Sequence, residues 1–365
     1  MESQMEPRAI KVKQDLATQN AAFDNHQEIV FLDAPDVGLH AIIAIHDTAL
    51  GPALGGTRMY PYASRSEALS DVLRLSSGMT LKNAIAGVPY GGGKATIIGN
   101  PKTDKTPELL QRYAQFINHF NGRFITGEDV GIRVPDADII AQTTPHIRGT
   151  SKSHTGDPSP FTALGVYEGI RAAVEHKYCG LGVHGLIISI QGLGAVGMEL
   201  AKLLHSAGAQ LIVSDIRDDV LIEAQARFGA KIISPDQAHA ADADIFAPCA
   251  LGGGLDDDKI PEIRARIVAG SANNQLRRSN DGAILQSYGI LYAPDYVINA
   301  GGVISIAHDK PGFDPIALNK HICAIGTTLR QIFRSSERTG KPTSNIADEM
   351  ARSRQNVSGK QGCAA

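Results

Sequence analysis

Two lysines of the chain stand in a glycine-rich stretch, where residues 76–101 read SSGMTLKNAIAGVPYGGGKATIIGNP. Lys82 is placed near the expected end of a helix, and Lys94 follows three glycines and precedes a β-rich run. A lysine held by flexible glycines against an apolar strand is partly desolvated, which lowers its pKa toward roughly 7–8, the range useful for acid–base catalysis. The pattern favours Lys94 as a catalytic group over the alternative, that both lysines are ordinary solvated side chains.

The same stretch does not match a nucleotide-binding P-loop. The P-loop pattern GxxxxGK[ST] needs Gly at position 88 and Ser or Thr at position 95. This chain has Val88 and Ala95 there. The sequence therefore does not predict a P-loop at this lysine.

A second glycine-rich turn stands between an apolar strand and a helix. After LIISI and Gln191 the chain continues with Gly192, Leu193, Gly194, Ala195, Val196 and Gly197. In this GxGxxG pattern the three glycines permit a tight turn, close approach of a pyrophosphate, and close packing of helix on strand. The next strand ends in Asp215, 23 residues after Gly192, where a carboxylate binds ribose hydroxyls and repels a 2′-phosphate. We expect these residues to bind NAD in preference to NADP. Arg217, two residues after Asp215, would weaken that preference.

The elements around these residues predict a two-domain α/β protein. From residue 185 the runs LIISI, LIVSD, DIFAP, RIVAG and ILYAP alternate with helices, which is typical of a doubly wound parallel sheet. We expect this Rossmann-type, NAD-binding domain over residues 151–329. Residues 1–150 mix the β-rich runs IVFLD, HAIIAIHD and ATIIGN with helices, one of which starts at a capping box of Ser64 and Glu67.

The boundary is expected in residues 148–160, RGTSKSHTGDPSP, a composition typical of a hinge loop. We expect the two domains to close over a cleft by bending there. A helix near residues 315–338 is expected to pack back across the cleft, so that a C-terminal segment from about residue 330 to 365 joins the first domain.

Composition excludes several classes of function. The 365 residues are 43% hydrophobic and 20% charged, with a net charge of −3, so nothing global attracts nucleic acid or an anionic membrane. The first twenty residues lack the apolar core of a secretory signal, and we expect a cytoplasmic protein. No metal site is expected, because the cysteines make no CxxC or Cys/His pair. These cysteines are Cys179, Cys249, Cys323 and Cys363.

Ordered motifs make the chain resemble the Glu/Leu/Phe/Val amino-acid dehydrogenase family, and its leucine branch most closely. They are GPALGGTRM (51–59), MTLKNAIAG (79–87), GGGKATIIG (91–99), ITGEDVG (125–131), GDPSPFTALGV (156–166), APCALGG (247–253), GSANNQL (270–276) and YAPDYVINAGGVI (292–304). The resemblance implies NAD-dependent, reversible oxidative deamination of an apolar L-amino acid to the 2-oxo acid and ammonia. It also implies a homo-oligomer built through a substrate-binding first domain.

The same resemblance assigns roles to individual residues. Lys94 would be the catalytic lysine, Asp129 would exchange a proton with the substrate nitrogen, and Lys82 would bind the α-carboxylate. Further contacts to that carboxylate are implied for Gly55, Gly56, Asn273 and Asn274. The side-chain pocket is implied to be lined by Leu54, Gly127, Val303 and Ile306. The cofactor is implied to touch, besides the turn and Asp215, the residues Thr162, Cys249, Ala250 and Asn273. Cys249 lacks a neighbouring histidine base in the sequence and is expected to be a small buried residue, not a nucleophile.

The sequence leaves three other functions as alternatives. A 2-hydroxy-acid dehydrogenase needs a catalytic His paired with an acid, and no motif supplies one. A non-catalytic NAD-binding regulator would be expected to have lost Lys82, Lys94 or Asp129. An aromatic amino-acid dehydrogenase is favoured by Gly127, because leucine dehydrogenases usually carry Ala there, whereas Val303 is leucine-like. An all-apolar pocket disfavours glutamate, and we expect a leucine-type enzyme that tolerates aromatic substrates.

Overall fold

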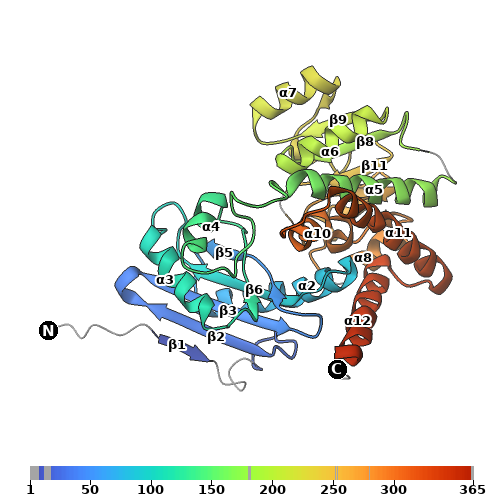
Figure 1. Cartoon of the computed structure of the whole chain (residues 1–365). Coiled ribbons are helices and arrows are strands. Elements are labelled where there is room, and N and C mark those ends of the chain that lie inside the picture. Colours follow the sequence, from blue (N-terminus) through green and yellow to red (C-terminus); the bar gives the residue numbers. More distant parts are fainter. Residues whose placement is uncertain are drawn as a thin grey trace. The chain divides into compact units, whose positions relative to one another are not determined.

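A computed structural model describes residues 8–11, 18–179, 182–250, 252, 254–278 and 280–362 of the chain. The contacts within it divide the chain into two compact units. The first unit comprises Met1–Gly156 with Ala351–Ala365, and the second comprises Asp157–Met350 (Figure 1). The C-terminal helix α12, Thr343–Gly362, begins in the second unit and ends in the first.

The first unit is built on a mixed sheet with strand order β1-β2-β3-β6-β4-β7, in which β5 also pairs with β6 (Figure 1). Its strands are β1 Arg8–Lys11, β2 Glu28–Ala34, β3 Leu39–Asp47, β4 Ala53–Leu54, β5 Thr57–Tyr60, β6 Gly91–Ile98 and β7 Phe124–Ile125. Antiparallel pairing joins β1, β2, β3 and β6, whereas β4 and β5 run parallel to β6. Two further helices of this unit are α3, Pro107–Asn118, and α4, Val134–Ala141, and a 3-10 turn, Pro35–Val37, joins β2 to β3.

Helix α2, Arg65–Ala86, begins where the sequence predicts. The hydroxyl of Ser64 accepts a hydrogen bond from the backbone N–H of Glu67 at 3.1 Å, which caps the first turn. The helix ends at Gly87, whose φ of +69° favours glycine. Lys82 therefore lies within the last turns of the helix, and α2 packs on β6 and β3.

The three glycines before Lys94 belong to strand β6, so the flexibility expected of them is wrong. A side chain at Gly91 would place its Cβ 2.0 Å from the carbonyl oxygen of Asp47, and one at Gly92 would lie 2.0 Å from Oγ1 of Thr80. The neighbouring chain segments approach so closely that only glycine fits. Lys94 is thus held by a central strand of the sheet.

The second unit is built on a fully parallel sheet with strand order β10-β9-β8-β11-β12-β13. Its strands are β8 Ile187–Gln191, β9 Gln210–Ser214, β10 Lys231–Ile232, β11 Ile245–Pro248, β12 Ile267–Val268 and β13 Leu291–Tyr292. From β8 the chain adds strands first on one side and then, from β11, on the other. The order is that of a doubly wound sheet, whose ligands bind where the direction reverses. The predicted fold class is confirmed.

The helices of this unit are α5 Ser159–Lys177, α6 Ala195–Ser206, α7 Asp218–Phe228, α8 Asp281–Ser287, α9 Asp295–Ile298, α10 Gly301–His308 and α11 Pro315–Thr339. Short 3-10 turns cover Pro235–Gln237 and Ile260–Glu262. Helix α11 packs on α5, α9 and α10, so residues 330–350 group with this unit, and of the C-terminal segment that was expected to join the first domain only residues 351–365 group with the first unit. Between β11 and β12 the described residues form the 3-10 turn Ile260–Glu262 in place of the expected helix. The short strand β10 was not predicted.

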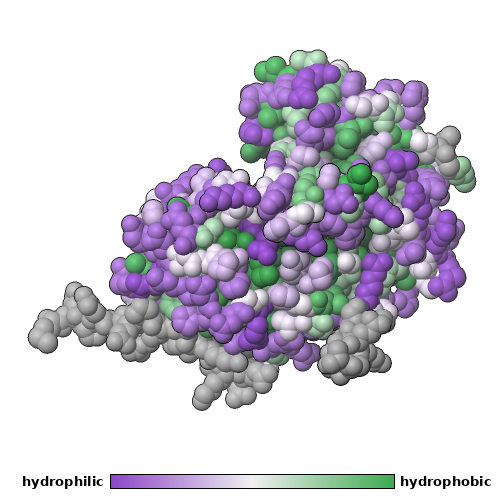
Figure 2. All heavy atoms as spheres, in the orientation of Figure 1, coloured by the Kyte–Doolittle hydropathy of each residue, from purple (hydrophilic) through white to green (hydrophobic). Residues whose placement is uncertain are grey.

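The surface seen in Figure 2 is mainly hydrophilic, with apolar atoms in small groups. Large exposed apolar side chains include Tyr60 and Val130 in the first unit and Ile216 and Ile222 in the second. Among the helices in the part of the chain that the structure describes, none is long and apolar enough to cross a membrane.

Candidate functional site

Asp129 lies on the loop that follows β7, and backbone hydrogen bonds fix this loop beside β5. The N–H of Thr57 donates to the carbonyl of Gly127 at 2.9 Å, and the N–H of Met59 donates to the carbonyl of Val130 at 2.8 Å. Because both donors are alternate residues of one strand, the loop runs alongside β5. The loop is thereby held at a fixed register against the sheet.

Asp129 and Lys94 form an ion pair within the first unit. Nζ of Lys94 lies 3.2 Å from Oδ2 of Asp129, and the two side chains are 8% and 21% exposed. Burial raises the pKa of Asp129, but the charges of Lys94 and Arg58 outweigh burial and hold that pKa below its ordinary value. Asp129 is therefore a carboxylate near neutral pH. A lysine and a carboxylate in this contact can exchange protons with a substrate bound beside them.

The glycine pair after β4 packs between the strand of Lys94 and the loop of Asp129. A Cβ at Gly55 would lie 1.8 Å from the carbonyl oxygen of Gly93, and a Cβ at Gly56 would lie 2.1 Å from that of Glu128. Because a side chain at Gly55 or Gly56 would collide with these carbonyl groups, only backbone atoms of the glycine pair lie between the strand of Lys94 and the loop of Asp129. The structure thus brings together six residues that sequence analysis selected: Leu54, Gly55, Gly56, Lys94, Gly127 and Asp129.

Lys82 belongs to helix α2, which packs against the same part of the first unit. Met79, one turn earlier on that helix, places its Cγ 3.2 Å from where a Cβ on Gly55 would lie. Residues three apart on a helix share a face, so Lys82 lies on the face of α2 that covers the glycine pair. Lys82 is partly buried. Its binding of a carboxylate stays a prediction.

Sequence analysis missed Arg58, although it lies in the quoted motif GPALGGTRM. Its Nε donates to Oδ2 of Asp129 at 2.9 Å, and its Nη1 donates to Oδ2 of Asp71 on α2, also at 2.9 Å. The signal that could have found it is a charged residue that alternates with the buried Thr57 and Met59. A charge in that position requires partners from neighbouring elements.

In the second unit, the turn after β8 has the geometry that the glycine pattern predicts. Gly192 has a φ of +98°, and a Cβ on Gly197 would lie 2.0 Å from the carbonyl oxygen of Gly192. Gly194 is the N-cap of α6, and a Cβ on it would meet nothing within 4 Å. Exposed Gly194 therefore leaves open the approach to the amides at the helix N-terminus, where phosphate oxygens bind.

Asp215 follows β9 and lies against this turn. Its carboxylate accepts hydrogen bonds from the backbone N–H of Leu193 at 2.6 Å and of Arg217 at 3.0 Å. Burial raises the pKa of Asp215, but these bonds and the charge of Arg217 lower it below the ordinary value. The Arg217 guanidinium also donates to the carbonyl of Leu193 at 3.1 Å. A carboxylate and a guanidinium thus stand together after the second strand of the doubly wound sheet, where dinucleotide-binding Rossmann folds distinguish NAD from NADP.

Cys249 and Ala250 follow β11 and pack beneath the glycine turn. A Cβ on Gly192 would lie 2.8 Å from the backbone nitrogen of Ala250, and one on Gly197 would lie 3.6 Å from Cβ of Cys249. Burial raises the pKa of the Cys249 thiol, so the thiolate that a nucleophile needs is disfavoured. In the described residues no three His, Cys, Asp or Glu side chains gather as metal ligands do.

The remaining predicted residues are distributed over three segments of the second unit. Thr162 lies in the first turn of α5, where its hydroxyl donates to the carbonyl of Pro158 at 3.1 Å. Asn273 is exposed and accepts a hydrogen bond from Asn299 at 2.8 Å, and Asn274 has a φ of +51°. The two pocket residues of this unit, Val303 and Ile306, lie on α10.

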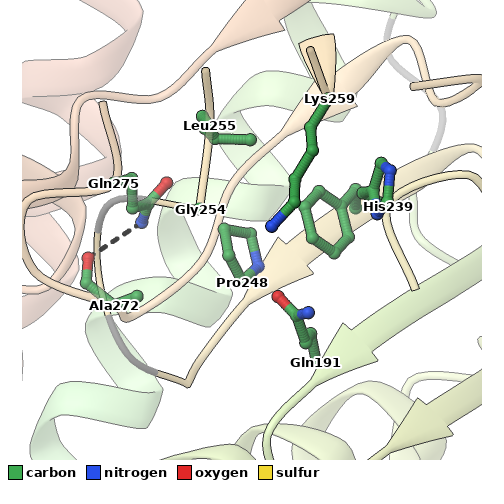
Figure 3. Close-up of a pocket in the computed structure, with 9 residues that line it drawn as sticks. Gln191, His239, Pro248, Gly254, Leu255, Lys259, Ala272 and Gln275 are labelled. Carbon is green, nitrogen blue, oxygen red and sulfur yellow. Dashed lines mark hydrogen bonds between the residues drawn. The ribbon is translucent and has the colours of Figure 1, made fainter. Parts of the chain in front are cut away.

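A small pocket lies at the ends of β8 and β11 (Figure 3). Its volume of about 10 Å³ suits one water molecule and is too small for a nucleotide. The side-chain amide of Gln275 donates to the carbonyls of Gly270 and Ala272, as Figure 3 shows for Ala272, and so fixes the loop that carries Asn273. The residues around this pocket therefore hold the loop of Asn273 in place.

Two family models match the chain. Residues 26–146 match the model described as Glu/Leu/Phe/Val dehydrogenase, dimerisation domain. Residues 217–309 match the model described as Glutamate/Leucine/Phenylalanine/Valine dehydrogenase. The first match contains Lys82, Lys94 and Asp129, and the second contains Cys249 and the loop of Asn273.

Similar proteins match almost the whole chain. Leucine dehydrogenase of Geobacillus stearothermophilus is 46% identical over 332 residues, which are 90% of each chain. L-tryptophan dehydrogenase of Nostoc punctiforme is 45% identical over 330 residues, 90% of this chain and 93% of the relative. A crystal structure of L-tryptophan dehydrogenase from Nostoc punctiforme superposes with a TM-score of 0.80 at 44% identity, covering 92% of this chain and 97% of that one. The resemblance read from the motifs is confirmed.

Proposed function

The chain belongs to the Glu/Leu/Phe/Val dehydrogenase family and is an amino-acid dehydrogenase, and we propose that it catalyses the NAD-dependent, reversible oxidative deamination of a branched-chain L-amino acid. The observation that carries the proposal is the contact of 3.2 Å between Lys94 and Asp129, beside the glycine pair and under the helix of Lys82. A non-catalytic regulator has no use for a buried proton-exchanging pair.

Family members depend on a nicotinamide cofactor, and the residues of the second unit fit one. The open approach at Gly194 leaves the amides of α6 free for a pyrophosphate. An ionised Asp215 accepts hydrogen bonds from two ribose hydroxyls and repels a 2′-phosphate, which supports NAD. When bound, the cofactor supplies the hydride acceptor. The other residues proposed to touch it are Thr162, Leu193, Ala195, Val196, Cys249, Ala250 and Asn273.

The balanced reaction converts the amino acid, water and NAD⁺ into the 2-oxo acid, ammonium, NADH and a proton. The C–H bond at the α-carbon breaks with its electron pair, and the carbon–nitrogen single bond becomes an imine. Water then adds to the imine carbon, and the carbon–nitrogen bond breaks to release ammonia. The reverse sequence is reductive amination.

Three side chains of the first unit act on the substrate, and two of them transfer protons. Lys82 binds the α-carboxylate, with backbone groups of Gly55 and Gly56. Asp129 takes a proton from the substrate ammonium, which frees the nitrogen lone pair for imine formation. Lys94 takes a proton from the attacking water and, once protonated, stabilises the negative charge that develops on oxygen. That Lys94 loses and regains a proton during turnover is part of the proposal.

Apolar residues support an aliphatic substrate. Leu54 and Val303 are buried, and no cationic side chain is among the residues assigned to the pocket. Glutamate is therefore disfavoured. Asn273, Asn274 and Ile306 complete the proposed set that meets the amino acid.

One observation favours a second candidate, an aromatic substrate. At Gly127 a Cβ would meet only the backbone of Arg148, with its oxygen at 3.4 Å, so the space beside this glycine is not filled by the protein. The identity of 45% to a tryptophan dehydrogenase is compatible with a larger pocket. A methyl-sized difference shifts selectivity by about 1–3 kcal/mol, so both substrate classes can be accepted.

The match of residues 26–146 to a dimerisation domain supports a homo-oligomer, which light scattering of the purified protein measures. The decisive experiment is a panel of L-amino acids assayed with NAD and with NADP. We expect the highest kcat/KM for leucine, valine or isoleucine with NAD. No reduction of either cofactor with any L-amino acid would refute the proposed function.

A further inference from the structure

A network of hydrogen bonds and ion pairs joins Asp71 on α2 to the Lys94–Asp129 pair of the first unit. Tyr62 donates its hydroxyl to Oδ2 of Asp71 at 2.7 Å, and Arg74 contacts Oδ1 of Asp71 at 2.9 Å. Asp71 accepts from Arg58, which in turn donates to Asp129, each at 2.9 Å. Neither Tyr62 nor Asp71 forms part of the site that the family resemblance implies.

Arg58 is the link through which this network reaches Asp129. Its side chain is 21% exposed, and the side chain of Asp71 is 16% exposed, so both charges are largely withdrawn from water. Asp71 and Asp129 come from different elements, and the rigid fork of a guanidinium holds both at once. The two carboxylates, Asp71 and Asp129, balance the charges of Arg58 and Lys94. Buried charges are stable only when they are paired in this way.

The geometry at Asp129 gives its two oxygens different tasks. Oδ2 receives both the Nε of Arg58 and the Nζ of Lys94. Oδ1 takes part in no hydrogen bond with the residues that the structure describes. With Oδ2 held by two cations, the carboxylate cannot rotate freely, and Oδ1 keeps one direction. A carboxylate that must receive a proton from a bound substrate gains from such fixed orientation.

We propose that Arg58 is a positioning residue for the deamination reaction. It holds Oδ2 of Asp129, so that Oδ1 of the same carboxylate meets the substrate nitrogen. Asp71, with Tyr62 behind it, holds Arg58 in turn. The proposal rests on the proposed function, because it takes Asp129 as the group that exchanges a proton with the substrate. It adds a residue that touches neither the substrate nor the cofactor.

The charged groups around Asp129 determine how removal of Arg58 acts. Lys94 faces it from β6 and Arg58 faces it from β5. Behind Arg58 stand Asp71 and Tyr62, whose raised pKa, caused first by burial and then by Asp71, keeps its phenol neutral. Within its own loop, the neighbouring carboxyl of Glu128 lies toward Gly149.

Loss of the Arg58 charge raises the pKa of Asp129, because Arg58 is one of the two charges that hold this pKa below its ordinary value. We therefore expect Arg58→Gln to move the acidic limb of the kcat/KM profile to higher pH by about one unit, the lower end for loss of a close opposite charge. We also expect kcat to fall by roughly a hundredfold, while KM for the amino acid changes less.

Arg58→Lys separates charge from geometry, because lysine keeps the charge but lacks the fork that reaches two acids. Its acidic limb is expected near that of the wild type, with a kcat between those of the wild type and Arg58→Gln. Arg74→Gln is the matched control. Arg74 is 54% exposed and pairs with Asp71 from the outside, so this variant is expected to keep the wild-type kcat and pH profile.

The experiment starts by showing that the wild type deaminates leucine, so a failure of the proposed function is seen before any variant is made. Thermal unfolding and NADH binding to the second unit then establish that each variant is folded. An Arg58→Gln enzyme with the wild-type limb would overturn the proposal, because a merely structural role lowers activity without moving the limb. An equal shift in Arg74→Gln would overturn it as well. If Arg58→Gln does not fold, Arg58→Lys decides, and an unchanged kcat refutes positioning.

Discussion

Nζ of Lys94 on strand β6 and Oδ2 of Asp129 on the loop after β7 lie 3.2 Å apart. The contact depends on glycines at three places, because Gly55, Gly56 and Gly93 let the chain segments approach to distances that no side chain permits. The ion pair is thus a consequence of close backbone packing. The proposed proton transfers depend on this contact, which the replacement of Lys94 by alanine removes.

Replacement of Lys94 by alanine is expected to lower kcat by 10²–10⁴-fold, the usual contribution of a general acid–base group. NADH binding, which depends on the second unit, is expected to stay close to the wild-type value. Steady-state kinetics and NADH fluorescence titration measure the two quantities. Lys341→Ala is the control, since Lys341 forms an exposed ion pair with Glu349 in the second unit. A Lys94→Ala enzyme that keeps more than about a tenth of kcat would show that the role is wrong.

Asp215 is predicted to set the cofactor preference. Its replacement by serine removes the charge that repels a 2′-phosphate and leaves Arg217 free to bind one, so the ratio of kcat/KM for NAD to that for NADP is expected to fall by roughly tenfold or more. Calorimetric titration with 2′,5′-ADP checks the same change without turnover. The exposed Asp242→Ser serves as control. Equal kcat/KM for both cofactors in the wild type would contradict the prediction.

The sequence predicted those parts of the site that local rules determine. The strand, glycine turn and helix around Gly192 are confirmed in the second unit, because the positive φ and the close helix packing are properties of neighbouring residues. The start of α2 at Ser64 is confirmed for the same reason. The motifs also indicated the family, although the roles of individual residues stay predictions.

What sequence analysis missed depends on contacts between distant segments. Gly91 reads as part of a loop until β6 is known to lie between β3 and the strands after Pro52, where close approach replaces flexibility. Arg58 and Asp71 meet because α2 packs on β6, the strand that pairs with β5, and no local pattern specifies that packing. The packing of helix α11 was predicted only from its place after the last strand. The structure shows that the helix packs on α5. Register and helix docking are set by the whole core.

His26 is predicted to make the first unit less stable in mild acid. It is 2% exposed; burial, followed by the charge of His46, lowers its pKa from 6.5 to about 4. Its Nδ1 accepts the N–H of Asp24 at 3.2 Å, and its Nε2 lies 2.9 Å from the Ser76 hydroxyl, so the neutral ring is already satisfied. The unfolded chain binds a proton below pH 6.5 but the folded chain binds it only near pH 4, so stability falls across that range.

The loss attributable to His26 is roughly 3 kcal/mol between pH 7 and pH 4. Chemical denaturation at several pH values measures it. His26→Gln, which cannot take up a proton, is expected to flatten the pH dependence, whereas the exposed His119→Gln is expected to leave it unchanged. A pH dependence identical in the wild type and His26→Gln would contradict the assignment.

Gly127 is predicted to decide how large a substrate side chain is accepted. Its φ lies outside the left-handed region, and a Cβ there would make ordinary contact with the carbonyl oxygen of Arg148 at 3.4 Å. Alanine is therefore compatible with the fold, and a change in activity reports on the pocket. If the added methyl group faces the substrate, Gly127→Ala shifts the ratio of kcat/KM for leucine to that for phenylalanine toward leucine by roughly tenfold.

The measurement compares leucine, valine and phenylalanine in both enzymes, with kcat and KM determined separately. A loss confined to phenylalanine means that the methyl group occupies space that an aromatic ring uses. An equal loss for all three substrates means that alanine disturbs the loop of Asp129, whose position depends on the bond from Thr57 to the Gly127 carbonyl. Gly78→Ala is the control, since this glycine lies on α2 with nothing within 4 Å of its Cβ position. An unchanged ratio would place the side-chain pocket elsewhere and remove the structural reason to expect aromatic substrates.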